Sequence, residues 1–337
     1  MIPDTTAAAI RHAILPYGSP TPAASIAQLA TSLGGFIASC AAMYAATTLS
    51  YGITLALAPL AAGFLVRVFI IQHDCGHMAF FRSRRLNDVV GTLCSLATLA
   101  PYRSWRRQHA GHHRVWNNLD QRLSGADIYS SCLTTDEYRR LPARRRLAYR
   151  ALRHPLVANL ILPPLIFIVL YRAPFDMPRS WKQERRAVWL TNIAVAAIVV
   201  ALGVVLGFGR VAAVQLPVML IASIVGVGLF SFQHRGTGVT WRRGATWTAT
   251  GAALESSTYL RLPRVLQWFT GNIGFHHIHH LMSRVPNYRL QQCHAAVAGM
   301  VEVRETSLAE AIRSLKLALW DEAGARLVTF RAARRLG

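Results

Sequence analysis

Three five-residue windows hold nine of the thirteen histidines of this chain: His73–His77, His109–His113 and His276–His280. Within each window, histidines lie three or four positions apart, a spacing that places imidazole rings on one face of a helix. Neutral imidazole is the commonest side-chain metal ligand in proteins. Because eight or nine imidazoles exceed what one transition-metal ion takes, the windows predict two metal ions.

Long apolar runs separate these windows and predict a protein with several membrane spans. The chain is 53% hydrophobic and only 15% charged, and a spanning helix needs about 20 apolar residues. Four runs meet that length and form two hairpins, at residues 29–49 with 53–71 and at residues 188–208 with 211–232. We therefore expect an all-α integral membrane fold, with one domain covering residues 1–337.

Two weaker apolar segments, residues 86–101 and 155–171, are expected to be re-entrant or interfacial. Pro163 and Pro164 interrupt the second segment. If that segment crossed the membrane, the third histidine window would lie on the opposite face from the first two, and no shared metal site could form. A short segment broken by proline can instead dip into the membrane where other parts of the protein bury its backbone.

The basic residues predict which face carries the histidines. Residues 73–154 hold 15 lysines and arginines against six acidic residues, and cytosolic loops are enriched in basic residues. We expect both termini in the cytosol, most simply of a bacterial inner membrane, and a helical cytosolic cap formed by residues 73–187 and 233–337. Residues 300–337 are expected to be an amphipathic helical region of this cap.

Charge and cysteine content exclude several other classes of protein. The net charge is +22, but no nucleic-acid-binding motif accompanies it, so anionic lipid headgroups are the simpler partners. The five cysteines form no C-x-x-C pair, which argues against an iron–sulfur cluster or a zinc knuckle. Cys75 lies inside the first window, where it is either a thiolate ligand or, in the interpretation we favour, a small residue in a tight turn. No cleaved signal peptide is expected.

The three windows and their flanks resemble those of integral-membrane fatty acid desaturases, most closely the omega-6/delta-12 group. The resemblance rests on HDCGH, HAGHH and HHIHH in this order, on Asn118-Leu119-Asp120, and on the segments 271–275 and 285–288 around the third window. It implies a non-haem di-iron centre that activates O₂. It also implies one further ligand, His234, directly after the last span.

The predicted metal ligands are therefore nine histidines, of which the eight in the windows are also expected to be essential for catalysis: His73, His77, His109, His112, His113, His234, His276, His279 and His280. His277 occupies an intervening position and is expected to point away from the metals. Four carboxylates are candidates for orienting these imidazoles, each with an ordinary surface or capping role as its alternative: Asp74, Asp120, Asp127 and Glu255. The sequence departs from its relatives after His234, where Arg235-Gly236-Thr237-Gly238 replaces a more acidic and aromatic stretch.

The residues themselves do not select iron, because neutral imidazoles also suit zinc, copper and nickel. The resemblance predicts a desaturase that uses two iron ions and O₂ to introduce a double bond into a long acyl chain carried by a lipid or an acyl carrier. A related hydroxylase, epoxygenase or acetylenase is the alternative, and oxidation of an alkane or carotenoid is a weaker one. A metal-ion transporter is the alternative from another class.

The reaction also needs electrons from outside the chain. We find no dinucleotide-binding glycine motif, no fused haem-binding motif and no cysteine set for an iron–sulfur cluster. A separate electron donor of the ferredoxin or cytochrome b5 type is therefore expected, and the basic cytosolic face should attract an acidic carrier.

Overall fold

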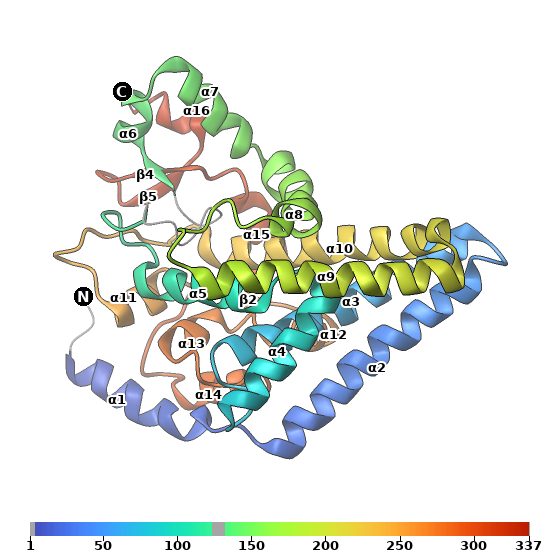
Figure 1. Cartoon of the computed structure of the whole chain (residues 1–337). Helices are drawn as coiled ribbons and strands as arrows, with labels where there is room; N and C mark the ends of the chain where they lie inside the picture. Colours follow the sequence, from blue (N-terminus) through green and yellow to red (C-terminus); the bar gives the residue numbers. More distant parts are fainter. Residues whose placement is uncertain (1–3, 123–131, 337) are drawn as a thin grey trace.

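The computed structural model describes residues 4–122 and 132–336. Its framework is a set of four long helices that extend toward the right of Figure 1, while the smaller elements gather around their left-hand ends. Each of the four is long and apolar enough to cross a membrane. They are α2 (Pro22–Ala46), α3 (Tyr51–Gly76), α9 (Lys182–Leu206) and α10 (Phe208–His234).

These helices overlap the four expected spans but extend further at the end that carries the histidines. Helix α3 continues through His73 to Gly76, and α10 continues to His234. A helix satisfies its backbone hydrogen bonds internally, so the chain stays helical where the apolar run stops. The predicted ligands His73 and His234 therefore lie at the ends of long, rigid helices. The expected mostly helical membrane architecture is confirmed.

The two hairpins have their turns side by side at the end away from the small elements. Arg210, next to the α9–α10 turn, donates a 3.0 Å hydrogen bond to the Thr47 hydroxyl and a 3.1 Å bond to the Tyr44 carbonyl near the α2–α3 turn. Buried residues of α3 and α10 also share one hydrophobic core, among them Ala62, Leu65 and Val218. Because the turns meet at one end, the histidine ends of α3 and α10 meet at the other.

Further helices build the region between the hairpins: α4 (Arg84–Thr98), α5 (Tyr102–Val115), α6 (Thr135–Arg140) and α7 (Ala143–Leu152). After α7 the chain bends by 54° into an irregular helix over Val157–Arg172. Two stretches with wide π-helical turns flank Leu162–Pro164, the segment of the proline pair, because proline cannot donate the regular backbone hydrogen bond. The segment then returns to the end where α9 begins (Figure 1).

The remaining elements, which include the N-terminal helix α1, lie around the histidine ends of the long helices and are called the cap from here on. Its helices are α1 (Asp4–Ile14), η1 (Leu15–Gly18), α11 (Ala249–Glu255), α12 (Arg264–Phe269), α13 (His276–Leu281), η5 (Asn287–Arg289), α14 (Leu290–Ala296), α15 (Leu308–Ser314) and α16 (Phe330–Ala333). Two small sheets complete it. β1 (Leu133–Thr134) pairs in parallel with β4 (Leu319–Asp321), which pairs antiparallel with β5 (Arg326–Val328), while β2 (Tyr259–Arg261) pairs in parallel with β3 (Glu305–Ser307).

The expectation of an amphipathic helical region at residues 300–337 is wrong. The segment contains β3, β4 and β5 besides two short helices. Gly324 donates a 3.1 Å bond to Asp321, and Ala325 adopts a left-handed conformation with φ 44°, so the chain turns back after β4. Leu319 and Trp320 are then buried in two different hydrophobic clusters. Packing on both faces of a strand decides the local structure here.

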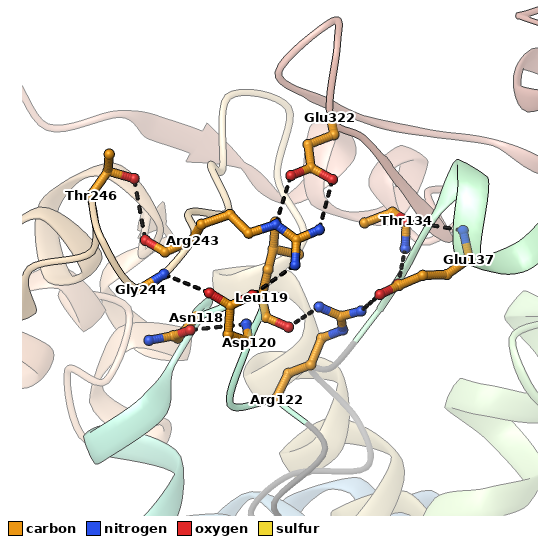
Figure 2. A network of polar contacts seen from close by, with 10 residues as sticks. All are labelled: Asn118, Leu119, Asp120, Arg122, Thr134, Glu137, Arg243, Gly244, Thr246 and Glu322. Atoms are coloured by element: carbon orange, nitrogen blue, oxygen red, sulfur yellow. Dashed lines mark hydrogen bonds and ion pairs between the residues drawn. The ribbon is translucent and has the colours of Figure 1, made fainter.

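A network of polar contacts joins four segments of the chain near the surface (Figure 2). Arg243, in the loop after α10, bonds to Asp120 (2.7 Å) and to both carboxylate oxygens of Glu322 (2.9 and 3.0 Å). Beside it, Arg122 pairs with Glu137 at the start of α6. The loop that follows α5 is thereby tied to the β4–β5 turn. The Arg243 pairs are exposed and so contribute little stability each, whereas the Arg122 side chain is buried. We therefore infer that the Arg243 pairs mainly align the loops that they join.

Candidate metal centre

The first window lies where α3 ends. His73 is on the last turn of the helix, His77 follows as its C-cap, and their ring centroids are 4.7 Å apart. The neighbouring Gln72 is fully buried and fixes this end, because its amide donates to the Ala100 carbonyl (3.0 Å) and accepts from the Thr98 hydroxyl (2.6 Å). These bonds set the α4–α5 connection against the end of α3.

Helix α5 carries the second window alongside α3. The Tyr102 hydroxyl, on the first turn of α5, donates a 2.9 Å bond to the Cys75 carbonyl. One turn later the Trp105 ring stacks on His109, with centroids 4.6 Å apart. The rings of Tyr102 and Trp105 are both buried. They fix the rotation of α5 about its axis, so His109 and His113 face His77.

The third window begins a short helix, α13, and meets the end of α10. Before it, Gly271 and Asn272 both have positive φ (54° and 56°), a conformation that favours glycine and tolerates asparagine. A Cβ on Gly271 would lie 2.7 Å from Ile70, so this turn also needs glycine to approach α3. The Gln233 amide donates a 2.8 Å bond to the Ile273 carbonyl, which places His234 against the window.

The structure brings the nine predicted histidines together as two neighbouring groups. One group is His73, His77, His109, His113 and His279; the other contains His112, His234 and His280. His276 joins the second group, because its Nε2 lies 2.9 Å from Nε2 of His234 and 3.1 Å from Nε2 of His280. Successive positions on a helix point about 100° apart. The adjacent pairs His112-His113 and His279-His280 therefore each supply one ring to either group.

The nitrogen geometry fits metal binding. His113 Nε2 lies 3.2 Å from Nε2 of His109 and 2.9 Å from Nε2 of His279. A neutral imidazole nitrogen carries one proton or none, so three nitrogens that converge in this way cannot satisfy one another by hydrogen bonds. Metal–nitrogen bonds of about 2.1 Å at right angles would hold adjacent ligands about 3.0 Å apart. The observed separations fit nitrogen ligands arranged around one cation, so each group could hold a metal ion.

Burial keeps the imidazoles in the form that binds metals. Burial lowers the pKa of His113 and His279 well below the ordinary histidine value, and the neighbouring imidazoles lower it further. Burial likewise lowers the pKa of His77, His109 and His280, again with a smaller contribution from neighbouring rings. The neutral form, with a lone pair free to bind a metal, is therefore the stable one at physiological pH.

Of the carboxylates predicted to orient the imidazoles, Asp74 contacts a histidine of the groups, while Asp120 and Glu255 pair with arginines. Asp74 lies 3.2 Å from Nδ1 of His73. Asp120 instead accepts from Gly244 N–H and Arg243, which lower its pKa (Figure 2). Glu255 pairs with Arg242. Asp127 lies outside the described residues.

Two further residues of the windows lie outside both groups. The His277 ring turns away from them and pairs with Nδ1 of His294 at 3.0 Å, and burial lowers the pKa of His277 to about 3. Cys75 is buried in an apolar cluster and belongs to neither group among the described residues. This agrees with the interpretation of Cys75 as a packing residue.

Two tryptophans of the centre were not identified as such from the sequence. Trp105 is buried and stacks on His109. Trp116 lies with its ring centroid 3.8 Å from that of His234, and its indole N–H donates to the Ser256 carbonyl (3.1 Å). The sequence did contain a signal for Trp116. It lies four residues after His112, at the end of α5, and this spacing places both rings on the same face of a helix.

A cavity of about 220 Å³ opens beside the histidines. Four of them line it, and most of the rest of its wall is apolar, from α3, α10 and the proline-broken segment. Phe69, Phe167, Met219 and Phe230 are among the lining residues. Among the described lining residues there is no lysine or arginine, and Asp176 is the one carboxylate. The lining positions on α10 run from residue 219 to residue 233, about 21 Å of helix. The cavity is therefore long, apolar and in contact with the histidines at one side.

Comparison with known proteins agrees with this geometry. The fatty acid desaturase family profile matches residues 47–308, more than half of the chain. The chain belongs to the fatty acid desaturase family. A fatty acid desaturase of Bacillus subtilis is 37% identical over 320 residues, which cover 95% of this chain and 90% of that protein.

More distant members of the family carry more specific names. An sn-1 oleoyl-lipid 12-desaturase of Synechocystis is 27% identical over 237 residues, covering 69% of this chain and 65% of that protein. An sn-1 acyl-lipid omega-3 desaturase (ferredoxin) of Synechocystis is 30% identical over 244 residues, covering 68% and 63%. The chain thus spans somewhat under two thirds of the length of these two relatives. Family membership makes the protein an oxidoreductase of lipid metabolism, which argues against the metal-ion transporter.

Proposed function

We propose that this protein is a membrane fatty acid desaturase that introduces a double bond into a long acyl chain by O₂-dependent di-iron chemistry. The observation that carries the proposal is the contact between the apolar cavity and the two histidine groups. His73 and His109 of one group, and His112 and His276 of the other, line the cavity directly. A chain lying in the cavity would therefore pass both groups.

The two groups would hold one iron each, with five imidazoles on one side and four on the other. When bound, the iron supplies the activation of O₂ that removal of two hydrogens from an unactivated chain requires. The protein itself positions the chain and excludes water. Ile70, Phe167 and Val227 offer only apolar surface to the chain, and such pockets bind by burial of apolar area.

We further propose an acyl-lipid as the substrate and a ferredoxin-type protein as the electron donor. Two observations support this: the names of the Synechocystis relatives and the lack of basic residues among the described residues that line the cavity. The four apolar helices support a location in a membrane, and the Bacillus subtilis relative supports the inner membrane of a bacterium. The basic segments at the histidine end support a cytosolic position for the cap and both termini.

The test is the fatty-acid profile of a bacterial host that lacks its own desaturase. Expression of the protein should produce monounsaturated or further unsaturated acyl chains in the host lipids, measured by gas chromatography with mass spectrometry. The variant His279→Ala should abolish the product while the protein remains in the membrane. A product that has gained oxygen instead of losing two hydrogens would replace desaturation by hydroxylation or epoxidation, and no new product would contradict the proposal.

A further inference from the structure

A buried polar chain leads from the first histidine group to the N-terminal span. Asp74 follows His73 on α3, is only 2% exposed, and has Oδ1 3.2 Å from His73 Nδ1. Its other oxygen, Oδ2, accepts the backbone N–H of Asn287 (2.7 Å) and the side-chain N–H of the same residue (2.8 Å). A buried carboxylate is tolerated only when hydrogen bonds of this kind satisfy it.

Asn287 is itself held from three sides. Its side-chain amide exchanges two hydrogen bonds with the amide of Gln28 on α2, at 2.8 and 3.1 Å. The side chain of Asn272, in the left-handed turn before the third window, donates a 3.2 Å hydrogen bond to the backbone carbonyl of Asn287. Asp74 only accepts hydrogen bonds, so the nitrogen of the Asn287 amide must face it, and the Gln28 amide then pairs with both ends of the Asn287 amide.

We propose that Asn287 is a positioning residue for the metal centre, which acts through Asp74 on His73 and is itself oriented by Gln28. The proposal rests on the proposed function in so far as His73 binds a metal. Asn287 approaches neither the cavity lining nor the histidine groups directly. Its effect on the metal passes through one carboxylate.

The physical argument concerns the proton on His73. A carboxylate can only accept a hydrogen bond, so Asp74 requires the proton of His73 to be on Nδ1. The lone pair of Nε2 is then free for the metal, and the ring is held in one orientation. Without the side-chain N–H of Asn287, the Asp74 carboxylate would lose one of the two bonds that hold Oδ2 in place. His73 would then lose its orientation.

The experiment is a titration of metal-free, detergent-purified protein with Co²⁺, followed by visible absorption and by counting bound metal. Asn287→Asp is nearly isosteric but replaces the donating N–H by a second carboxylate facing Asp74. We expect it to weaken the site that contains His73 by about 10–100-fold and to change its Co²⁺ spectrum, as loss of an orienting partner does. The site formed by His112, His234, His276 and His280 should bind as in the unmodified protein.

A matched control separates positioning from simple tethering of the loop. Tyr288 ties the same loop to the same end of α2, by accepting from Thr21 N–H (2.9 Å) and contacting the Ser25 hydroxyl (3.1 Å), but it has no bond to Asp74 among the described contacts. Tyr288→Phe should leave Co²⁺ affinity and spectrum unchanged. The Gln28 side chain is linked to Asp74 through Asn287, so Gln28→Ala should weaken Co²⁺ binding at the same site to a smaller extent. This variant replaces Asn287→Asp as the test if Asn287→Asp does not fold.

The outcomes separate this inference from the proposed function. If the unmodified protein binds two Co²⁺ ions and both Asn287→Asp and Gln28→Ala bind them with the same affinity and spectrum, the positioning role is overturned while the metal centre stands. The same holds if Tyr288→Phe weakens binding as much as Asn287→Asp. If the unmodified protein binds no Co²⁺, both proposals are overturned.

Discussion

At the scale of single residues, the spacing of the histidines predicted most of the centre, because helical periodicity is a local property. The sequence did not say which histidines share a metal site, and the structure places the adjacent residues His112 and His113 in different groups. The partner of Asp74 could not be predicted in the same way. Asn287 is 213 positions away along the chain, and no periodicity relates the two.

The placement of His112 and His113 in different groups gives a prediction for single substitutions. If each group holds one ion, as proposed, His112→Ala and His113→Ala should each lower the metal content from two ions per chain toward about one, since each variant removes a ligand from a single site. The measurement is metal analysis of purified protein together with its spectrum. The two variants should retain different ions and so differ in spectrum. His154→Ala, at an exposed histidine outside the groups, is the control; loss of both ions in either variant would contradict the separation.

At the scale of elements, the long helices were predictable because a membrane span needs a continuous apolar run. The ends of these helices and the strands of residues 300–337 were not, because they depend on contacts made elsewhere in the fold. The corner between α3, α4 and α5 is an example. The Tyr102 ring of α5 packs directly on Gly91 of α4, where a larger residue would not fit. The sequence gives no sign of this contact.

The packing at this corner predicts the effect of a single methyl group. A Cβ on Gly91 would lie 2.3 Å from the Tyr102 ring, and the hydroxyl of that ring bonds to the Cys75 carbonyl at the end of α3. Gly91→Ala should destabilise the protein by about 1–3 kcal/mol through overpacking, and lower activity by moving α5. Thermal unfolding in detergent measures the first effect. Gly34→Ala, in α2 with no heavy atom within 4 Å of the added Cβ, should be neutral or stabilising, and equal behaviour of the two variants would contradict the packing argument.

The wall of the cavity gives a second element-scale prediction. Ala222 on α10 lines the cavity, whereas Leu220 on the same helix is 42% exposed on its outer surface. Ala222→Phe should fill the space and reduce conversion of long acyl chains more than that of shorter ones, with unchanged metal content. Leu220→Phe should leave the product profile unchanged. Gas chromatography of host lipids measures both, and a normal profile in Ala222→Phe would mean that the chain lies elsewhere.

At the scale of the whole molecule, the net charge of +22 is the property that bears on electron delivery. The described residues of α7 include three adjacent arginines, Arg144, Arg145 and Arg146, all exposed. Anionic lipid could use the same charge, so the measurement belongs in nanodiscs of neutral lipid. A basic face of this size should steer an acidic carrier and raise its rate of association.

We therefore expect reconstituted turnover to require an added acidic electron carrier and to fall as ionic strength rises, since salt screens charges at the surface. Changing Arg144, Arg145 and Arg146 together to glutamine should raise the KM for the carrier about tenfold and leave kcat at saturating carrier nearly unchanged. Arg210→Gln, at the hairpin turns on the opposite end of the long helices, is the control and should change neither constant. A rate that is indifferent to salt, or turnover with NADH alone, would show that delivery of electrons does not depend on this charged face.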